Sequence, residues 1–202
     1  MPILPMLAFI VIVITGMVIL IFRDWRINAA ALGLQYLAGF ILVDLSWPIG
    51  MAVIKLIVGW MASSALAFTC LRQLKRKAEP EPASSLIFRG IIGLLTIIVI
   101  FIIASDIRQN IFPGVDLVIL QAGLTLLGLS LMQLGSSAEP YLTIISLLSL
   151  MAGFEMIHAA LEISTLLTGL LVVVNLGLAL VGVFFITKNA DKSESSFEED
   201  SA

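Results

Sequence analysis

The sequence is poor in the residues from which most metal and cofactor sites are built. Its 202 residues contain one cysteine, Cys70, and one histidine, His158. A lone cysteine cannot close an internal disulfide, and the chain has no group of His and Cys residues to hold zinc or an iron–sulfur cluster. A haem with two histidine ligands from this chain is excluded in the same way. The sequence therefore predicts no metal and no cofactor.

Charge is also scarce, and apolar residues replace it. Charged residues make up 12% of the chain and hydrophobic residues 60%, whereas a soluble domain has about 25% charged residues. A soluble fold of this size could not bury so much apolar surface, so we expect a lipid bilayer as the surroundings. No basic surface suited to nucleic acid remains. Motifs of phosphate-binding loops, serine hydrolases and zinc proteases are missing, so we expect no enzymatic chemistry from this chain alone.

Long apolar runs fill most of the sequence, and a run of about 20 such residues is enough to span a bilayer as a helix. They predict an all-α, polytopic integral membrane protein of about seven transmembrane helices. Arg23 and Arg26 follow the first run instead of preceding it, which favours a retained helix over a cleaved signal peptide. The predicted spans are residues 3–22, 28–45, 49–71, 86–105, 117–135, 141–161 and 165–187.

Lysine and arginine are concentrated in alternate loops. They follow the first span, the third span and the seventh span, while the opposite loops hold little more than Arg108. Because cytoplasmic loops carry the excess of positive charge, the pattern predicts the N-terminus outside and the C-terminus in the cytoplasm. The expected location is the cell membrane.

Composition divides the chain into four parts. A three-helix membrane part covers residues 1–72, and a four-helix membrane part covers residues 86–187. Between them lies a linker, 73–85, that is basic and then rich in Pro, Glu and Ser. The tail, 188–202, is acidic and predicted to be disordered. Small residues of the seventh span, including Gly169, Gly177 and Gly182, are expected to let neighbouring helices approach closely.

Four of the ionisable residues within or at the edge of the spans are candidates for function, because a charge there is costly. Glu155, His158 and Glu162 share one face of the sixth span, because they are spaced three and seven residues apart. Lys55 lies about seven residues into the third span. A carboxylate near an imidazole is the kind of pair that can pass protons, and this face runs from mid-membrane toward the interface. All four are candidates for a proton path.

Each candidate also has a purely structural explanation. Glu155 can be a hydrogen-bonded clamp between helices, Glu162 a solvated residue at a helix end, and Lys55 a side chain that extends to the interface. Neutral polar residues within the spans are predicted to be helix clamps of the same kind. These clamp candidates are Asn175, Gln121, Gln133 and Gln35.

The segment from Gly123 to Lys188 resembles a family of small membrane subunits. It begins GLTLLGL, has a short polar turn, then a helix with an embedded glutamate, and ends in an apolar helix followed by lysine. This plan is similar to the K-type subunit of respiratory complex I, the C subunit of multisubunit sodium/proton antiporters and component E of hydrogenase-4-type complexes. The resemblance implies that Glu155 matches the family's membrane glutamate and, less specifically, that Lys55 matches a lysine of an early helix. Asparagine is missing beside Glu155, and the next helix has no second glutamate.

Two functions remain open from the sequence. The first is an accessory membrane subunit of a proton- or sodium-translocating redox or antiporter-type complex, which binds other membrane subunits and adds its carboxylate and histidine to a proton path. The second is a structural or assembly membrane protein in which the polar residues act only as clamps. A stand-alone small transporter is less favoured, because the sequence shows neither inverted repeats nor helices interrupted by proline.

Overall fold

The computed structural model describes residues 3–73, 82–137, 139–162 and 164–199, without the side chains of residue 73 and residues 190–199. Within these residues the chain is all-α and forms seven helices, each long and apolar enough to cross a membrane. The helices are α1 (Ile3–Ile21), α2 (Trp25–Val43), α3 (Ile49–Gln73), α4 (Ala83–Asn110), α5 (Leu117–Ser136), α6 (Pro140–Leu161) and α7 (Thr165–Glu199).

Polar caps and turns fix where the helices begin and end. The Asp24 side chain accepts a hydrogen bond from the backbone N–H of Arg26 and starts α2, while Asp116 does the same for α5 through Val118. The turn before α5 contains Gly114, whose φ of 109° only glycine adopts readily. Because Asp24 caps it, α2 begins three residues before the predicted span at residue 28.

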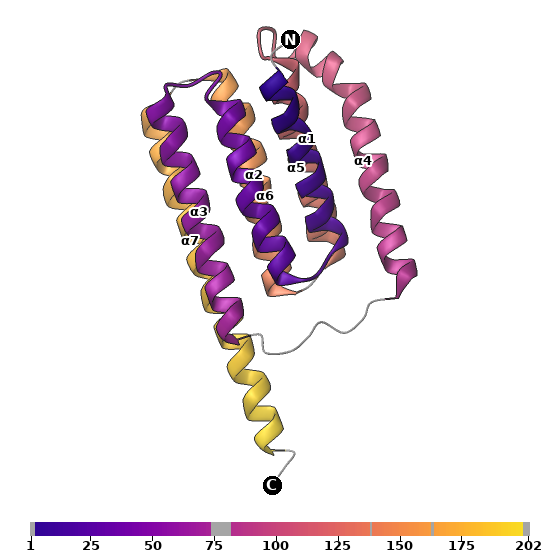
Figure 1. Cartoon of the computed structure of the whole chain (residues 1–202), viewed down its shortest axis with the longest axis vertical. Helices are drawn as coiled ribbons and strands as arrows, with labels where there is room; N and C mark the ends of the chain where they lie inside the picture. The colour runs from indigo at the N-terminus through magenta and orange to yellow at the C-terminus, as the bar shows by residue number, and fades with distance from the viewer. Residues whose placement is uncertain (1–2, 74–81, 138, 163, 200–202) are drawn as a thin grey trace.

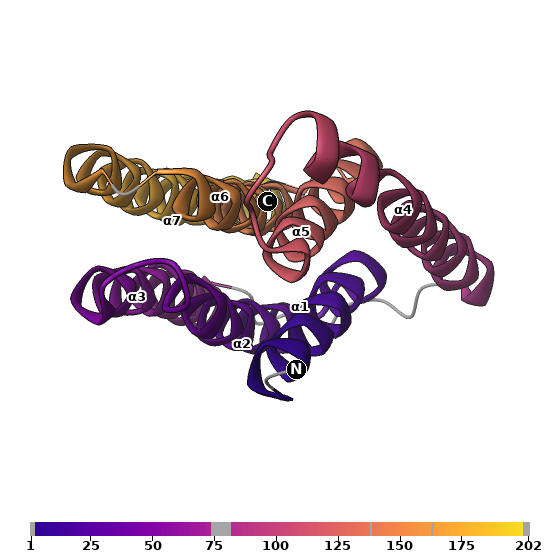
Figure 2. The same ribbon diagram turned by 90° about the horizontal axis from the view of Figure 1, so that it is seen from above.

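The helices form two facing layers of three, with a seventh helix at one edge (Figures 1 and 2). One layer is α1, α2 and α3, and the other is α5, α6 and α7. The layers are stacked in order, so that α1 packs on α5, α2 on α6 and α3 on α7. The fourth helix, α4, packs on α5 and the edge of α1. The predicted N-terminal and C-terminal membrane parts therefore share one core.

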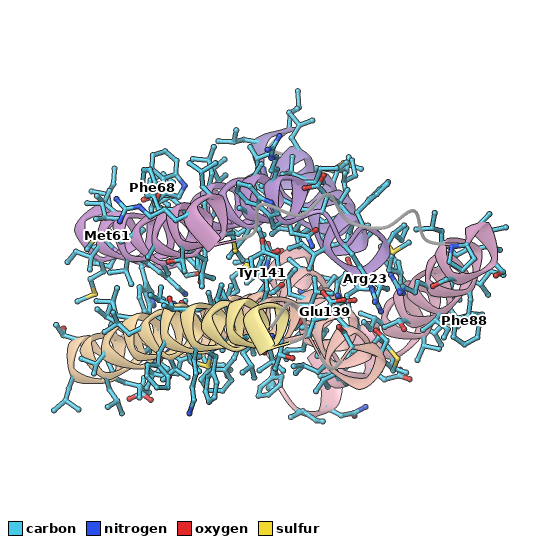
Figure 3. The ribbon with its side chains drawn as sticks, turned by 90° about the horizontal axis from the view of Figure 1, so that it is seen from below. Arg23, Met61, Phe68, Phe88, Glu139 and Tyr141 are labelled. Atoms are coloured by element: carbon cyan, nitrogen blue, oxygen red, sulfur yellow. The ribbon has the colours of Figure 1, made fainter. Side chains whose placement is uncertain are left out.

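Exposure follows this arrangement. α6 lies between α5, α7 and α2 and is the most buried of the seven helices, whereas α4 is the least buried. The outward surface is apolar: Figure 3 shows Met61, Phe68 and Phe88 pointing away from the bundle, and all three are exposed. An apolar outer surface around a polar-containing interior is the pattern expected of a bundle surrounded by lipid.

The chain termini lie at opposite ends of the molecule (Figure 1). We call the end that holds the start of α1 and the α2–α3, α4–α5 and α6–α7 connections the N-terminal end. The C-terminal end holds the α1–α2 and α5–α6 connections. There Arg23 and Glu139 point toward one another and form an ion pair at 3.3 Å (Figure 3).

One sequence expectation differs from the structure, and a second falls largely outside the described residues. Disorder is predicted from residue 188, but α7 continues as a helix to Glu199 and projects beyond the other helices (Figure 1). The segment contains neither Gly nor Pro to end the helix, and its Lys and Glu residues are good helix formers. Of the predicted linker 73–85, residues 74–81 lie outside the described residues. At its two ends, Gln73 belongs to α3 and α4 begins at Ala83.

The close contacts made by glycine are also placed differently. Gly169 and Gly177 of α7 face open space, and of the three predicted glycines Gly182 alone lies against neighbouring side chains. The glycines at which an added Cβ would meet the backbone of another helix are instead Gly123 in α5 and Gly153 in α6. A Cβ built on Gly153 would lie 2.8 Å from the carbonyl oxygen of Gly123, so a side chain there would push the helices apart.

Candidate functional site

A buried ion pair joins the two layers. The ammonium Nζ of Lys55 in α3 lies 3.0 Å from Oε2 of Glu155 in α6, and the two side chains are 11% and 3% exposed. Lys55 follows the start of α3 by six residues, and Glu155 precedes the end of α6 by six. At 1.5 Å per residue, both therefore lie about 9 Å inside the N-terminal end of the bundle.

Two further helices complete the surroundings of Glu155. Its second oxygen, Oε1, accepts a hydrogen bond of 3.2 Å from the side-chain amide of Asn175 in α7. The Asn175 carbonyl oxygen in turn accepts a 3.2 Å hydrogen bond from the hydroxyl of Tyr36 in α2. Lys55, Glu155, Asn175 and Tyr36, which we call the Lys55 network, thus connect four helices and are all buried.

Local sequence explains why these side chains can meet. Gly59 follows Lys55 by four residues, one turn further along the same face of α3. The ring of Tyr36 lies directly against Gly59, where a Cβ would collide with it. Glycine therefore lets α2 and α3 pack closely enough for Tyr36 to reach Asn175 across the bundle.

Burial makes the charge pairing important. A single charge in the middle of a bilayer costs about 2.5–3.5 kcal/mol on insertion scales, so neither Lys55 nor Glu155 is easily kept charged alone. As a pair they neutralise one another, and the amide of Asn175 donates a hydrogen bond to one oxygen of the carboxylate. A proton added to Glu155 or removed from Lys55 would therefore leave the other residue as an unpaired buried charge.

His158 lies one turn from Glu155, toward the N-terminal end. Its ring is stacked with Phe154 at a centroid distance of 6.3 Å, and it makes a T-shaped contact with the ring of Trp47, also at 6.3 Å. Both ring nitrogens are shielded from solvent and have no hydrogen-bond partner among the described residues. The structure therefore places His158 near the Lys55 network, but without a direct hydrogen bond to Glu155.

Glu162 is separated from the network. It caps the end of α6, where its backbone N–H donates to the carbonyl of His158, and its side chain is exposed. This is the solvated helix-end position that the structural explanation describes. The four proton-path candidates thus divide into a joined pair, Lys55 and Glu155, a neighbour, His158, and an exposed residue, Glu162.

The glutamines predicted as clamps occupy three different environments. Gln35 is buried, and its Nε2 donates to the Ser149 hydroxyl at 2.6 Å, which joins α2 to α6. Gln133 is buried near the end of α5. Gln121 is half-buried, and its backbone carbonyl accepts from Thr125 of the same helix. Asn175, the fourth predicted clamp, belongs to the Lys55 network.

Two residues of this region are missed by the sequence argument. Tyr36 lies inside a span, whereas tyrosine prefers the membrane interface, and this position is a signal that could have identified it. Trp47 reads as an interfacial residue of the α2–α3 connection, yet it is buried. The Nζ of Lys55 lies 5.6 Å from the centre of the Trp47 ring.

Fold and site together define a class: an all-α bundle of membrane-protein type with a buried ion pair between its two layers. Comparisons with protein-family models, with curated proteins and with solved structures find no match to this chain.

Proposed function

We propose that the chain spans the cell membrane seven times, with its C-terminal end in the cytoplasm. Seven helices of sufficient length support this, as does the position of the basic residues. Arg23, Arg26 and Arg72 lie in or beside the connections of the C-terminal end, and Arg108 lies at the N-terminal end, in the last turn of α4. Excess positive charge marks the cytoplasmic side.

We further propose that the protein is an accessory membrane subunit of a proton- or sodium-translocating redox or antiporter-type complex. The observation that carries this proposal is the Lys55–Glu155 ion pair, which is buried within a bundle of apolar helices. Intramembrane ionisable residues are rare and typically serve substrate or proton pathways. The resemblance of residues 123–188 to a family of such subunits, with Glu155 at the glutamate position, points the same way.

In this function Glu155 and Lys55 exchange protons in turn. A proton that reaches Glu155 neutralises the carboxylate, and Lys55 is then left as a buried cation without a counter-ion. Lys55 releases its proton in response, because an unpaired charge is the costliest state of the site. Removal of the proton from Glu155 restores the pair and draws a proton back to Lys55.

The alternative function, a structural or assembly protein with the Lys55 network as a clamp, also has a specific observation in its favour. Asn175 and Tyr36 form a continuous hydrogen-bonded chain to Glu155, and such interhelical bonds stabilise membrane bundles. The two functions differ in what Lys55→Met together with Glu155→Gln does. The double variant leaves no charge unpaired and keeps a hydrogen-bonding side chain at position 155, so a clamp tolerates it, whereas a proton path does not.

Purification of the tagged chain in mild detergent, followed by mass spectrometry, tests the subunit proposal. Co-purification of large antiporter-like subunits, or of a quinone-reductase or hydrogenase module, is the expected result. Recovery of the chain alone or as a homo-oligomer would overturn it. With partners in hand, Lys55→Met together with Glu155→Gln, which leaves no charge unpaired, is expected to abolish proton movement by the complex while leaving its assembly intact. The matched control is Gln121→Glu, which adds a carboxylate outside the Lys55 network.

A further inference from the structure

Unpartnered polar atoms gather around Trp47, between the Lys55 network and the N-terminal end. Among the described residues, Nε1 of Trp47 and both ring nitrogens of His158 are shielded from solvent and lack hydrogen-bond partners. Trp47 itself is 4% exposed. Buried polar atoms are nearly always satisfied by protein or by ordered water, so a cluster of unsatisfied ones indicates a bound ligand.

The Trp47 ring lies against Lys55 and His158. Its centre is 5.6 Å from the ammonium of Lys55, and it meets the ring of His158 in a T-shaped contact. The ring is held in place by a tight turn, since the backbone N–H of Trp47 donates to the carbonyl of Val43 and Pro48 follows directly. Trp47 therefore separates the ion pair from the end of the bundle.

The two ends of the bundle differ in their distance from Glu155. Toward the C-terminal end the layers meet through buried apolar side chains such as Leu32 and Leu148 and through the buried Gln35–Ser149 hydrogen bond. Glu155 lies six residues from the end of α6 at the N-terminal end, so the shorter route to that surface, about 9 Å deep, passes Trp47 and His158.

We propose that Trp47, His158 and Lys55 bind ordered water, and that this water connects the ion pair to the N-terminal end of the bundle. The ligand class follows from the donors and acceptors present: an indole N–H and an ammonium donate, and an imidazole nitrogen accepts, so a neutral molecule with both capacities fits. A proton leaves the Lys55 ammonium for the water, and the water passes a proton to His158. Trp47 acts as a positioning residue, because it holds the water and touches both neighbours.

The water site rests on the proposed function only for its role in proton movement. Its existence is a property of the chain and is tested without any partner or transport assay. If the water site proves absent, Glu155 can still exchange protons by another route. If the protein proves to have no transport role, the water site can still exist. The two failures are therefore distinguishable.

Fluorescence of single-tryptophan variants in vesicles tests the site. Trp25→Phe with Trp60→Phe leaves Trp47 as the sole tryptophan, and Trp25→Phe with Trp47→Phe leaves Trp60, which is 48% exposed on the apolar surface. If Trp47 binds water, it emits at longer wavelength than Trp60 despite its deeper burial. Emission from Trp47 at the shorter wavelength of a dry core would overturn the proposal.

Acidification tests the link to His158, because an imidazole that takes up a proton is expected to quench the emission of the indole ring beside it. We expect a loss of Trp47 emission when the N-terminal side of oriented vesicles is acidified, and none when the C-terminal side is. His158→Phe keeps the stacked ring and should remove the response, whereas Glu162→Gln should keep it. A response unchanged in His158→Phe would contradict the proposal.

The acidification experiment needs controls for the other charged groups at the N-terminal end. They come from α3, the α2–α3 connection, α5 and α6, and they are Lys55, Asp44, Asp116, Glu155 and Glu162. Asp44→Asn and Asp116→Asn are expected to leave the emission response of Trp47 as it is. If either variant removes the response while His158→Phe keeps it, the water path to His158 is wrong.

Discussion

Two ion pairs of nearly equal length have very different surroundings. Lys55 and Glu155 meet at 3.0 Å with side chains 11% and 3% exposed, while Arg23 and Glu139 meet at 3.3 Å with side chains 28% and 55% exposed. An exposed pair contributes about 0–1 kcal/mol, but breaking a buried pair leaves an uncompensated charge. We therefore expect the interior pair to contribute far more to the stability of the fold than the exterior pair.

The largest effect is expected from removing one member of the interior pair. Glu155→Ala leaves the Lys55 ammonium buried without a counter-ion, and we expect a loss of about 3–5 kcal/mol in the free energy of unfolding. Unfolding of the purified protein in detergent, followed by circular dichroism, measures it. Glu139→Ala is the matched control at the exterior pair. Equal losses in the two variants would contradict the comparison.

A smaller effect is expected at the α5–α6 contact, which holds Glu155 in its place. Gly153→Ala puts a methyl group against the backbone of α5 and should cost about 1–3 kcal/mol, because the helices must separate. Gly169→Ala is the control, since open space surrounds that glycine and alanine favours the helix. The same unfolding assay measures both variants. An unfolding free energy of Gly153→Ala equal to that of the native chain would show that α5 and α6 do not pack closely at this glycine.

Removing the neutral partner of the interior pair sharpens the comparison further. Asn175→Ala deletes the amide that bonds Glu155 and accepts from Tyr36, with an expected loss of about 1–2 kcal/mol for interhelical hydrogen bonds in a membrane. Tyr36→Phe removes only the outer bond and should lose less. If Tyr36→Phe is the more destabilising change, the order of bonds in the Lys55 network is wrong.

The smallest effect is expected at the exterior pair itself. Arg23→Gln should change the unfolding free energy by less than about 1 kcal/mol, and added salt should reduce even that difference. Stability measured at low and high salt checks it. A large, salt-independent loss would mean that Arg23 is held as tightly as Lys55.

The sequence predicts the helices well, because apolar length alone marks a span. It predicts their ends less well, since α2 begins at an Asp24 cap and α7 continues through a polar tail that contains no helix breaker. The stacking of the two layers has no signal in a single sequence. Tertiary packing decides which glycine meets a neighbour, and for this reason Gly123 and Gly153 form the contact that the sequence assigns to Gly169 and Gly177.

For the site, the sequence identifies the ionisable residues but not their partners. Glu155, His158 and Glu162 share a helix face by spacing, yet the partner of Glu155 is Lys55, which is 100 positions away in the chain. From the sequence alone, the Lys55 side chain could equally extend to the membrane interface, because the position of α3 relative to α6 is not known. Trp47 is hidden for a similar reason, because its burial depends on the packing of the α2–α3 connection against α6.

Proton movement by membranes that carry Lys55→Met together with Glu155→Gln tests the central claim most directly. The double variant removes both charges at once, so no charge is left unpaired, and the bundle should fold and bind its partners. The account predicts that proton movement by the complex is nevertheless lost, because both proton-exchanging groups are gone. Proton movement at the native rate in the folded double variant would contradict it and would leave the ion pair as a clamp.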